Sequence, residues 1–206
     1  MRDAIEWTSE ELALLADKAF FPAKARITQK IRLLLEQCHV IFSEELKQWH
    51  LLAPPALNLE AVQFVKGEHL EDFPYQYLDF PRYYTRREKF AFRTLFWWGH
   101  HVVFALILEG GHLRQYKENM INRYADIADR GVTLCLSHSL WDWHQGPGYT
   151  LDITRSRKSQ VAAVLADRPF MKLATFVPLI DSVMTSGQLV ERGRQAFRAM
   201  LPIVTV

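Results

Sequence analysis

Residues 73–111, FPYQYLDFPRYYTRREKFAFRTLFWWGHHVVFALILEGG, form the densest aromatic run of the chain and also hold a cluster of arginines and a His-His pair. Residues 90–98 and residues 102–109 within them are rich in aromatic and β-branched side chains, which favour strands. Gly99-His100 between the two runs is typical of a hairpin turn. We therefore expect the centre of an antiparallel sheet here.

The run 90–98 is apolar on both of its faces. Side chains of an extended strand point alternately to opposite faces. One face would carry Phe90, Phe92, Thr94, Phe96 and Trp98. The other face would carry Ala91, Arg93, Leu95 and Trp97. Because neither row is typical of a water-facing surface, the strand is predicted to be central and covered on both sides.

Helices are predicted before and after this sheet region. Thr8 and Glu11 have the spacing of a capping box, and a second helix beginning near Pro22 carries an apolar stripe at helical spacing. The stripe consists of Ile27, Ile31, Leu34, Leu35, Cys38, Ile41, Phe42, Leu46 and Trp49. A last amphipathic helix follows Gly187, and Pro202 is expected to stop it.

The chain is interpreted as a single α+β domain spanning residues 1–206. Its parts are a helical region at 8–52, a sheet-centred region at 60–154 and a C-terminal helical region at 159–202, with the apolar run 170–179 extended. We expect a mainly antiparallel sheet of about five or six strands, flanked by N-terminal and C-terminal helices.

Composition is ordinary for a globular protein. Hydrophobic residues make up 49% of the 206 residues and charged residues 23%, enough for one sizeable core. A net charge of +2 is too small to indicate a nucleic-acid-binding protein by itself. The chain begins without a signal-peptide pattern and has no run long enough to span a bilayer, so a cytoplasmic protein with no membrane partner is expected.

Cys38 and Cys135 each lie inside an apolar run and lack CxxC spacing. This pattern favours buried free thiols in a reducing compartment, with a single disulfide between them as the alternative.

Two segments resemble the YktB-like group of uncharacterised bacterial proteins. The first contains YLDFPR, REKFAFRTLFWW and VFALILEG within residues 73–111, and the second contains FMKLATFVPLI and GQLVERGRQAFRAMLPIV. The resemblance covers about half of the chain. It implies a compact α+β domain with a mainly antiparallel sheet and helices packed against it, and it carries no catalytic residues.

Arginines alternate with aromatic residues around Arg82, Arg93 and Trp97. Guanidinium groups pair with phosphates and carboxylates, and bases stack on aromatic rings, so the cluster is open to two binding functions. The first is a small anion and the second is single-stranded nucleic acid, which would need exposed Tyr83, Tyr84 and Trp97. The structural alternative is a sheet core in which Arg93 forms an ion pair, because a buried charge needs a partner. That partner would be Asp72, Asp79 or Glu109.

Histidines form a second group, with His100 and His101 near the hairpin turn and His138 and His144 in a separate loop. With Asp142 they are candidates for an enzyme site that holds a divalent metal and a water nucleophile. Adjacent residues of a strand point to opposite faces, so at most one of His100 and His101 would join it. Because no HxH, HExxH or CxxC spacing is present, we expect no metal and no cofactor.

Two further segments are worth noting. The loop 141–149, WDWHQGPGY, has a turn-forming Gly-Pro-Gly and is expected to cap the sheet with its tryptophans turned inward. Arg155, Arg157 and Lys158 precede a predicted helix at 159–167 and are candidates for an anion site at its N-terminus.

The leading interpretation is a non-catalytic protein that binds a small anionic ligand or a protein partner at the polar end of the sheet. Its predicted ligand-binding residues are Arg82, Arg93, Trp97, His101 and His144. A concave pocket there would support this interpretation, whereas a fully packed sheet end with Arg93 paired to an acid would contradict it. The catalytic residues, if any, and the oligomeric state stay open at this point.

Overall fold

One antiparallel sheet organises residues 5–206, the part of the chain that the computed structural model describes. Seven strands form it in the order β1-β2-β3-β4-β7-β5-β6. The strands are β1 (Gln63–Leu70), β2 (Phe73–Tyr84), β3 (Lys89–Trp97), β4 (His101–Glu109), β5 (Thr133–Cys135), β6 (Thr150–Asp152) and β7 (Phe170–Pro178). Every pairing is antiparallel, and the hairpin turn predicted at Gly99-His100 joins β3 to β4.

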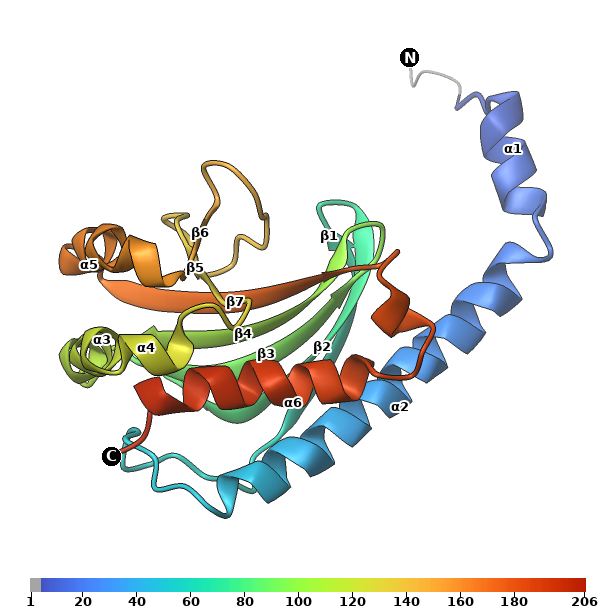
Figure 1. The fold of residues 1–206 in the computed structure, drawn as a ribbon. Coiled ribbons are helices and arrows are strands. Elements are labelled where there is room, and N and C mark those ends of the chain that lie inside the picture. Colours follow the sequence, from blue (N-terminus) through green and yellow to red (C-terminus); the bar gives the residue numbers. More distant parts are fainter. Residues whose placement is uncertain (1–4) are drawn as a thin grey trace.

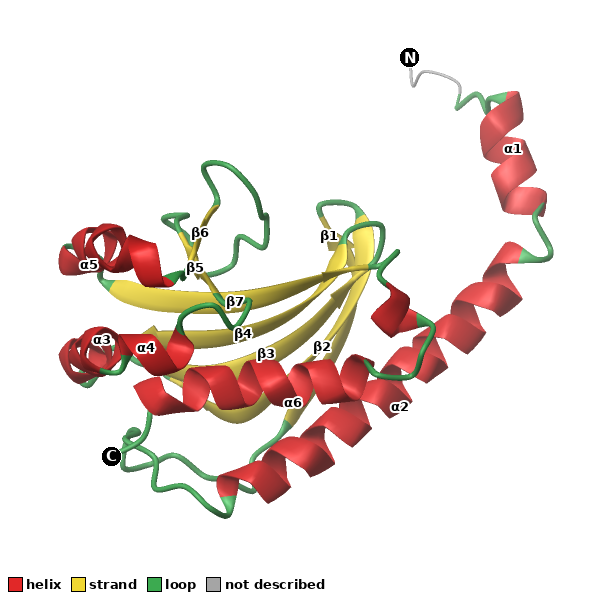
Figure 2. Ribbon diagram, viewed as in Figure 1, coloured by secondary structure: helices red, strands yellow, loops and turns green. Residues whose placement is uncertain are grey.

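Helices from the two ends of the chain lie together against this sheet, so the predicted α+β architecture is confirmed (Figure 1). The helices are α1 (Ser9–Ala16), α2 (Phe20–Leu46), α3 (Leu113–Asn122), α4 (Tyr124–Ile127), α5 (Lys158–Ala166) and α6 (Leu189–Met200). Figure 2 shows α2 and α6 side by side on one face of the sheet, with α1 standing apart from it. Within residues 5–206 no helix combines the length and the apolar character needed to cross a membrane.

β3 is buried on both faces, as its alternation predicts. Phe90, Phe92 and Phe96 belong to the larger core, which α2, α3 and α6 cover. Leu95 and Trp97 belong to a smaller core on the opposite face. We call these the helical face and the loop face of the sheet.

Three aromatic rings join the two long helices to the sheet on the helical face. Phe42 of α2 stacks on Phe197 of α6 with ring centroids 4.7 Å apart, and both rings meet Phe92 of β3 edge-on. Such aromatic pairs add specific geometry to the hydrophobic burial. The cluster therefore fixes how α2 and α6 lie on the sheet.

The loop face has no long helix over it. Leu140 and Trp143, from the long connection between β5 and β6, pack instead against the small core of Leu95, Trp97 and Val103. We refer to residues 136–149 as the covering loop. A loop excludes water less completely than a helix, because much of its backbone must itself reach solvent.

The two cysteines belong to different cores, Cys38 to the helical face and Cys135 to the loop face. Both are free and buried, which confirms the prediction of free thiols. Burial raises the pKa of the Cys38 thiol to about 12 and that of Cys135 to about 11. Both groups are thus held as unreactive thiols.

Several details differ from the sequence-based predictions. Ile27 and Trp49, placed on the buried stripe of the second helix, are each 44% exposed. Trp49 lies beyond the end of α2 at Leu46, so the helical spacing does not reach it. The extended run predicted at 170–179 is β7, but it pairs with β4 and β5 inside the sheet. The last α-helix ends at Met200, two residues before Pro202 as predicted, and the 3₁₀ turn Leu201–Ile203 follows it. The short strand β6 was not predicted because three residues give too little periodicity to recognise.

A register shift in β2 positions the polar residues of the loop face. Asp79 lies opposite Arg93, whereas Arg82 lies opposite Ala91, so β2 has an extra residue between the two pairs. A bulge of this kind changes the alternation of the strand. As a result Asp79, Arg82 and Tyr84 all share the face of Arg93.

Gly193 of α6 lies where the helix comes closest to β4. A Cβ atom built at this position would lie 2.6 Å from Cε1 of the buried Phe104 ring. We expect Gly193→Ala to lower the free energy of unfolding by about 1–3 kcal/mol, since overpacking outweighs the gain of ~1 kcal/mol in helix propensity. Urea unfolding would measure this. Gln195→Ala, on the exposed side of the same helix, is the control and should be nearly neutral. A stabilised Gly193→Ala protein would contradict this account of the contact.

Candidate ligand-binding site

A pocket of about 280 Å³ opens on the loop face between β1, β2, β3 and the covering loop. Its walls are mainly aromatic, and one charged residue contributes to its lining. The lining residues are Leu70, Tyr75, Tyr77, Arg93, Leu95, Trp141 and Trp143. We call it the aromatic pocket. It is smaller than the roughly 300–1,000 Å³ of pockets for drug-sized ligands, so it suits a small molecule.

Arg93 and Asp79 form a buried ion pair with two parallel hydrogen bonds. Nε and Nη2 of Arg93 donate to Oδ1 and Oδ2 of Asp79, both at 2.7 Å. The hydroxyl of Tyr84 donates a third bond to Oδ2 of Asp79 at 2.9 Å. Burial alone would lower the pKa of the guanidinium, but the hydrogen bonds and charge of Asp79 outweigh it and the pKa of Arg93 is raised. Arg93 is therefore fixed and permanently charged.

Aromatic rings surround the guanidinium. Its Cζ lies 3.7 Å from the ring centroid of Tyr77 and 5.0 Å from that of Trp141. Rings at these distances attract a cation through their electron-rich faces. Within the described residues Nη1 of Arg93 has no hydrogen-bond partner, although the side chain lines the pocket. That N–H group is thus free to donate to a ligand.

Lys172 places a second cation beneath the covering loop. This β7 residue is 1% exposed and donates to the backbone carbonyls of Leu140, at 3.0 Å, and Asp142. No carboxylate lies within salt-bridge distance of Nζ among the described residues. Burial lowers the pKa of the ammonium, and the charge of Arg93 adds to this effect. Lys172 holds the loop to the sheet through neutral backbone carbonyls, and these do not compensate the charge of its ammonium group.

The three buried charged groups of this face do not cancel. Arg93 and Lys172 are cations, and Asp79 is the one fully buried carboxylate beside them. The carboxylate of Asp142, which is 24% exposed, also acts on Lys172 but is shared with His144. Charges interact strongly where water is excluded. The excess positive charge therefore favours an anionic group in the pocket next to Arg93.

His101 and Trp97 form hydrogen bonds with the backbone of two residues that line the pocket. Nε2 of His101 lies 2.9 Å from the carbonyl of Trp143, and because a carbonyl only accepts, Nε2 carries the proton. Burial lowers the pKa of His101 to about 4, so the ring is neutral at physiological pH. Nε1 of Trp97 donates to the carbonyl of Leu70 at 3.0 Å. Both residues thus hold pocket-lining residues in place.

His144 joins the covering loop to the β1–β2 turn. Its Nδ1 lies 2.8 Å from Oδ1 of Asp142, and its Nε2 lies 3.2 Å from Oε2 of Glu71. One imidazole thereby connects a carboxylate of the loop with a carboxylate of the turn. The loop that carries Trp141 and Trp143 is fastened to the body at His144, at Lys172 and at His101.

Of the predicted ligand-binding residues, Arg93 alone lines the pocket. The other predicted residues do not line it but contact residues next to it: Trp97 binds Leu70, His101 binds Trp143, and His144 binds Asp142 and Glu71. Arg82 lies beside Tyr84, with Cζ 5.4 Å from the ring centroid, and its buried Nε has no hydrogen-bond partner. Asp79 is one of the three partners anticipated for Arg93. The pocket beside this ion pair lies on the loop face of the sheet rather than at the end of the sheet where the site was predicted.

Sequence reasoning missed Tyr75, Tyr77 and Lys172 as parts of this site. The signal for Lys172 was available, since a lysine in the apolar run 170–178 is as unusual as Arg93 in its own strand. Tyr75 and Tyr77 gave no signal, because an aromatic residue on a strand is typical of an ordinary sheet face. The inward tryptophans of the covering loop were anticipated, and Trp143 is buried whereas Trp141 is 44% exposed.

The histidines do not form the metal-binding group that was considered, as far as residues 5–206 show. His100 belongs to the turn rather than to β4, so the rule of alternation does not apply to it and its ring stacks on Trp97 at 3.6 Å between centroids. His138 is exposed in the covering loop. In the described part of the chain no group of three or more His, Cys, Asp or Glu side chains is arranged to hold a metal ion.

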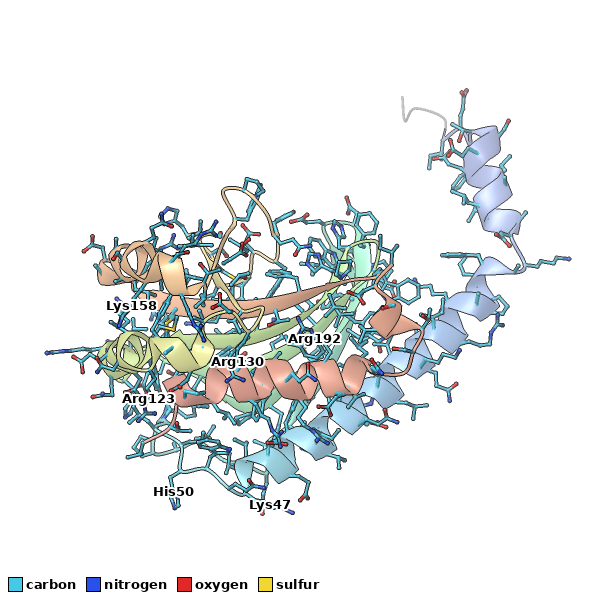
Figure 3. The ribbon with its side chains drawn as sticks, viewed as in Figure 1. Lys47, His50, Arg123, Arg130, Lys158 and Arg192 are labelled. Carbon is cyan, nitrogen blue, oxygen red and sulfur yellow. The ribbon has the colours of Figure 1, made fainter. Side chains whose placement is uncertain are left out.

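The remaining candidate surfaces have other roles. The Trp97 ring is fully buried and is not available for stacking of a nucleic-acid base. Arg155 and Arg157 pair with Asp129 at 3.4 Å and Asp152 at 3.3 Å, so the basic segment before α5 is largely neutralised. Figure 3 shows Lys158 at the α5 end of the molecule, and Lys158 is not among the residues that line the aromatic pocket.

Comparisons with protein-family models, with curated proteins and with solved structures find no match to this chain. The resemblance to the YktB-like group therefore stays a prediction.

Removing the Asp79 carboxylate would leave Arg93 buried without its partner. We expect Asp79→Asn to lower the free energy of unfolding by about 3–5 kcal/mol, measured by urea unfolding. Asp72→Asn, at an exposed carboxylate of the neighbouring turn, is the matched control. The double variant Asp79→Leu with Arg93→Met should be more stable than Asp79→Asn, because it leaves no unpaired charge. Equal effects of Asp79→Asn and Asp72→Asn would show that the pair is not buried as described.

His101 makes the stability of the protein depend on pH. Its pKa is about 4 in the folded state against a usual 6.5, so the unfolded chain binds the proton first as the pH falls. Stability is therefore complete above pH 6.5 and declines towards pH 4, by on the order of 3 kcal/mol. His101→Gln keeps a side-chain N–H donor for Trp143 but does not titrate. Unfolding curves across this range should show a shallower decline for His101→Gln, and parallel declines would contradict the role of His101.

Proposed function

We propose that this protein binds a small anionic molecule in the aromatic pocket and acts as a binding protein rather than an enzyme. The observation that carries the proposal is the excess buried positive charge of Arg93 and Lys172 beside a partly open aromatic cavity. Carboxylates accept strong, charge-assisted hydrogen bonds from guanidinium N–H groups. The ligand we infer is a small carboxylate with a flat or apolar body.

Each part of the pocket has a role in this function. Nη1 of Arg93 donates a hydrogen bond to the carboxylate, while Asp79 keeps the guanidinium oriented through its other two donors. The rings of Tyr75, Tyr77 and Trp141 pack against the body of the ligand. A volume of about 280 Å³ restricts that body to about one ring.

The groups that would carry out catalysis are occupied elsewhere, which supports binding without chemistry. His101 and Lys172 donate to backbone carbonyls, and neither lines the pocket. A general acid or base has to lie within hydrogen-bond distance of the substrate. The pocket therefore offers recognition and exclusion of water but no proton-transfer group other than its tyrosine hydroxyls.

Three probes of nearly equal shape test the charge preference. Phenylacetate carries a carboxylate, phenylacetamide is its neutral counterpart and phenethylamine is a cation. We expect phenylacetate to raise the melting temperature most and phenethylamine least, because a ligand that binds only the folded state stabilises it. Isothermal titration calorimetry would give the affinities. A protein that binds none of the three, or that prefers the amine, would contradict the proposal.

Variants of single residues test whether phenylacetate binds in the aromatic pocket. Trp141→Ala should weaken phenylacetate binding at least about tenfold, or ~1.4 kcal/mol, whereas Trp49→Ala should not, although Trp49 is equally exposed at 44%. Lys172→Met should weaken binding of phenylacetate but leave that of phenylacetamide nearly unchanged. Equal losses for both probes would show that Lys172 acts only by holding the loop.

A further inference from the structure

The N-terminal segment carries apolar side chains that the rest of the chain does not cover. None of the residues of α1 is buried, and Trp7, Leu12 and Leu15 are 59%, 51% and 59% exposed. We call residues 5–21 the arm. Figure 1 shows that it leads away from the body of the molecule. Most of the large exposed apolar side chains in the described part of the chain belong to this arm and to the outer side of α2.

The arm is a well-formed helix but a short one. Thr8 and Glu11 make the reciprocal hydrogen bonds of a capping box, which confirms the predicted helix start. Yet isolated helices of fewer than about 12 residues are marginal in water. An apolar helix of eight residues therefore needs a surface to pack against.

The corner between α1 and α2 directs the arm away from its own chain. Oδ1 of Asp17 accepts hydrogen bonds from the backbone N–H groups of Ala19 and Phe20, at 2.7 and 3.0 Å. These bonds order the backbone where α2 begins.

A groove of about 700 Å³ lies between the first half of α2 and the β1–β2 edge of the sheet. Its floor includes the apolar side chains of Leu35, Phe64 and Val65. Its rim includes Lys24, Arg32, Lys66 and Glu68. Lys24 and Lys66 share Glu68 as their partner, at 2.5 and 3.7 Å, and Arg32 pairs with Glu36 at 2.6 Å while its guanidinium lies 3.7 Å over the Phe64 ring. With both carboxylates counted, the rim keeps a surplus of one positive charge.

The arm and the groove have complementary charge. Glu6, Glu10, Glu11 and Asp17 outnumber Lys18 in the arm, so it is acidic as well as apolar. The groove is apolar with a basic rim. From this complementarity we propose that the groove binds the arm of a second copy of the same chain.

In a dimer, the arm of each copy can occupy the groove of the other copy. In a two-fold dimer each copy supplies one arm and one groove, so the two contacts are identical and the assembly closes. Complementary charge at the rim sets the direction in which the acidic arm enters. The contact uses the helical face of the sheet, so it leaves the aromatic pocket open.

Sedimentation equilibrium of the full chain tests the proposal. The wild-type protein should have twice the monomer mass of 24.1 kDa. The arm variant Leu12→Glu with Leu15→Glu should have the monomer mass, and so should the groove variant Ala25→Trp, whose new ring occupies the groove. All three substitutions are at exposed positions, so the fold should be retained, as circular dichroism would verify. Trp49→Glu, at an exposed position just after the C-terminal end of α2 and away from the groove, should remain a dimer.

Mixing the two monomeric variants identifies the contact. The groove variant retains an intact arm and the arm variant retains an intact groove, so the mixture should recover a heterodimer with one contact. A wild-type monomer, a dimer that survives the arm variant, or a mixture that stays monomeric would each overturn the proposal.

Discussion

Arg93 and Asp79 face each other across β3 and β2 with two hydrogen bonds of 2.7 Å, and this buried ion pair constrains the whole loop face of the sheet. A charge in the middle of a buried strand is tolerated only when an opposite charge pairs with it and hydrogen bonds satisfy both groups. Tyr84 completes the hydrogen bonding of the carboxylate, and the rings of Tyr77 and Trp141 lie over the guanidinium. The bulge in β2 brings Asp79 and Tyr84 to the same face.

The two faces of the sheet are closed by different means, which explains where the pocket lies. On the helical face, α2 and α6 present continuous apolar stripes, and Phe42, Phe92 and Phe197 interlock. On the loop face, an irregular segment covers the strands and is held by polar contacts from Lys172, His101 and His144. Such a segment does not fill space as a helix does, so a cavity lined by its tryptophans remains.

The aromatic pocket and the N-terminal arm are two separate surfaces that the rest of the chain leaves uncovered. The pocket is small, aromatic and fixed by hydrogen bonds, which suits recognition of one small molecule. The arm projects from the body and is apolar and acidic, so it suits contact with a larger surface of complementary character. Neither depends on the other, since the groove lies at the helical face whereas Arg93 and Lys172 lie under the loop face.

The sequence by itself determined the long helices, the central strands and the two-sided burial of β3, because strand alternation and helical spacing are local properties of the chain. It also marked Arg93 as a charge in need of a partner. Only the tertiary structure decided which carboxylate pairs with Arg93, that β7 runs inside the sheet, and that Lys172, Tyr77 and Trp141 meet around one cavity. These features depend on strand order and on a one-residue bulge. Both are set by packing between residues far apart in sequence, which no local pattern records.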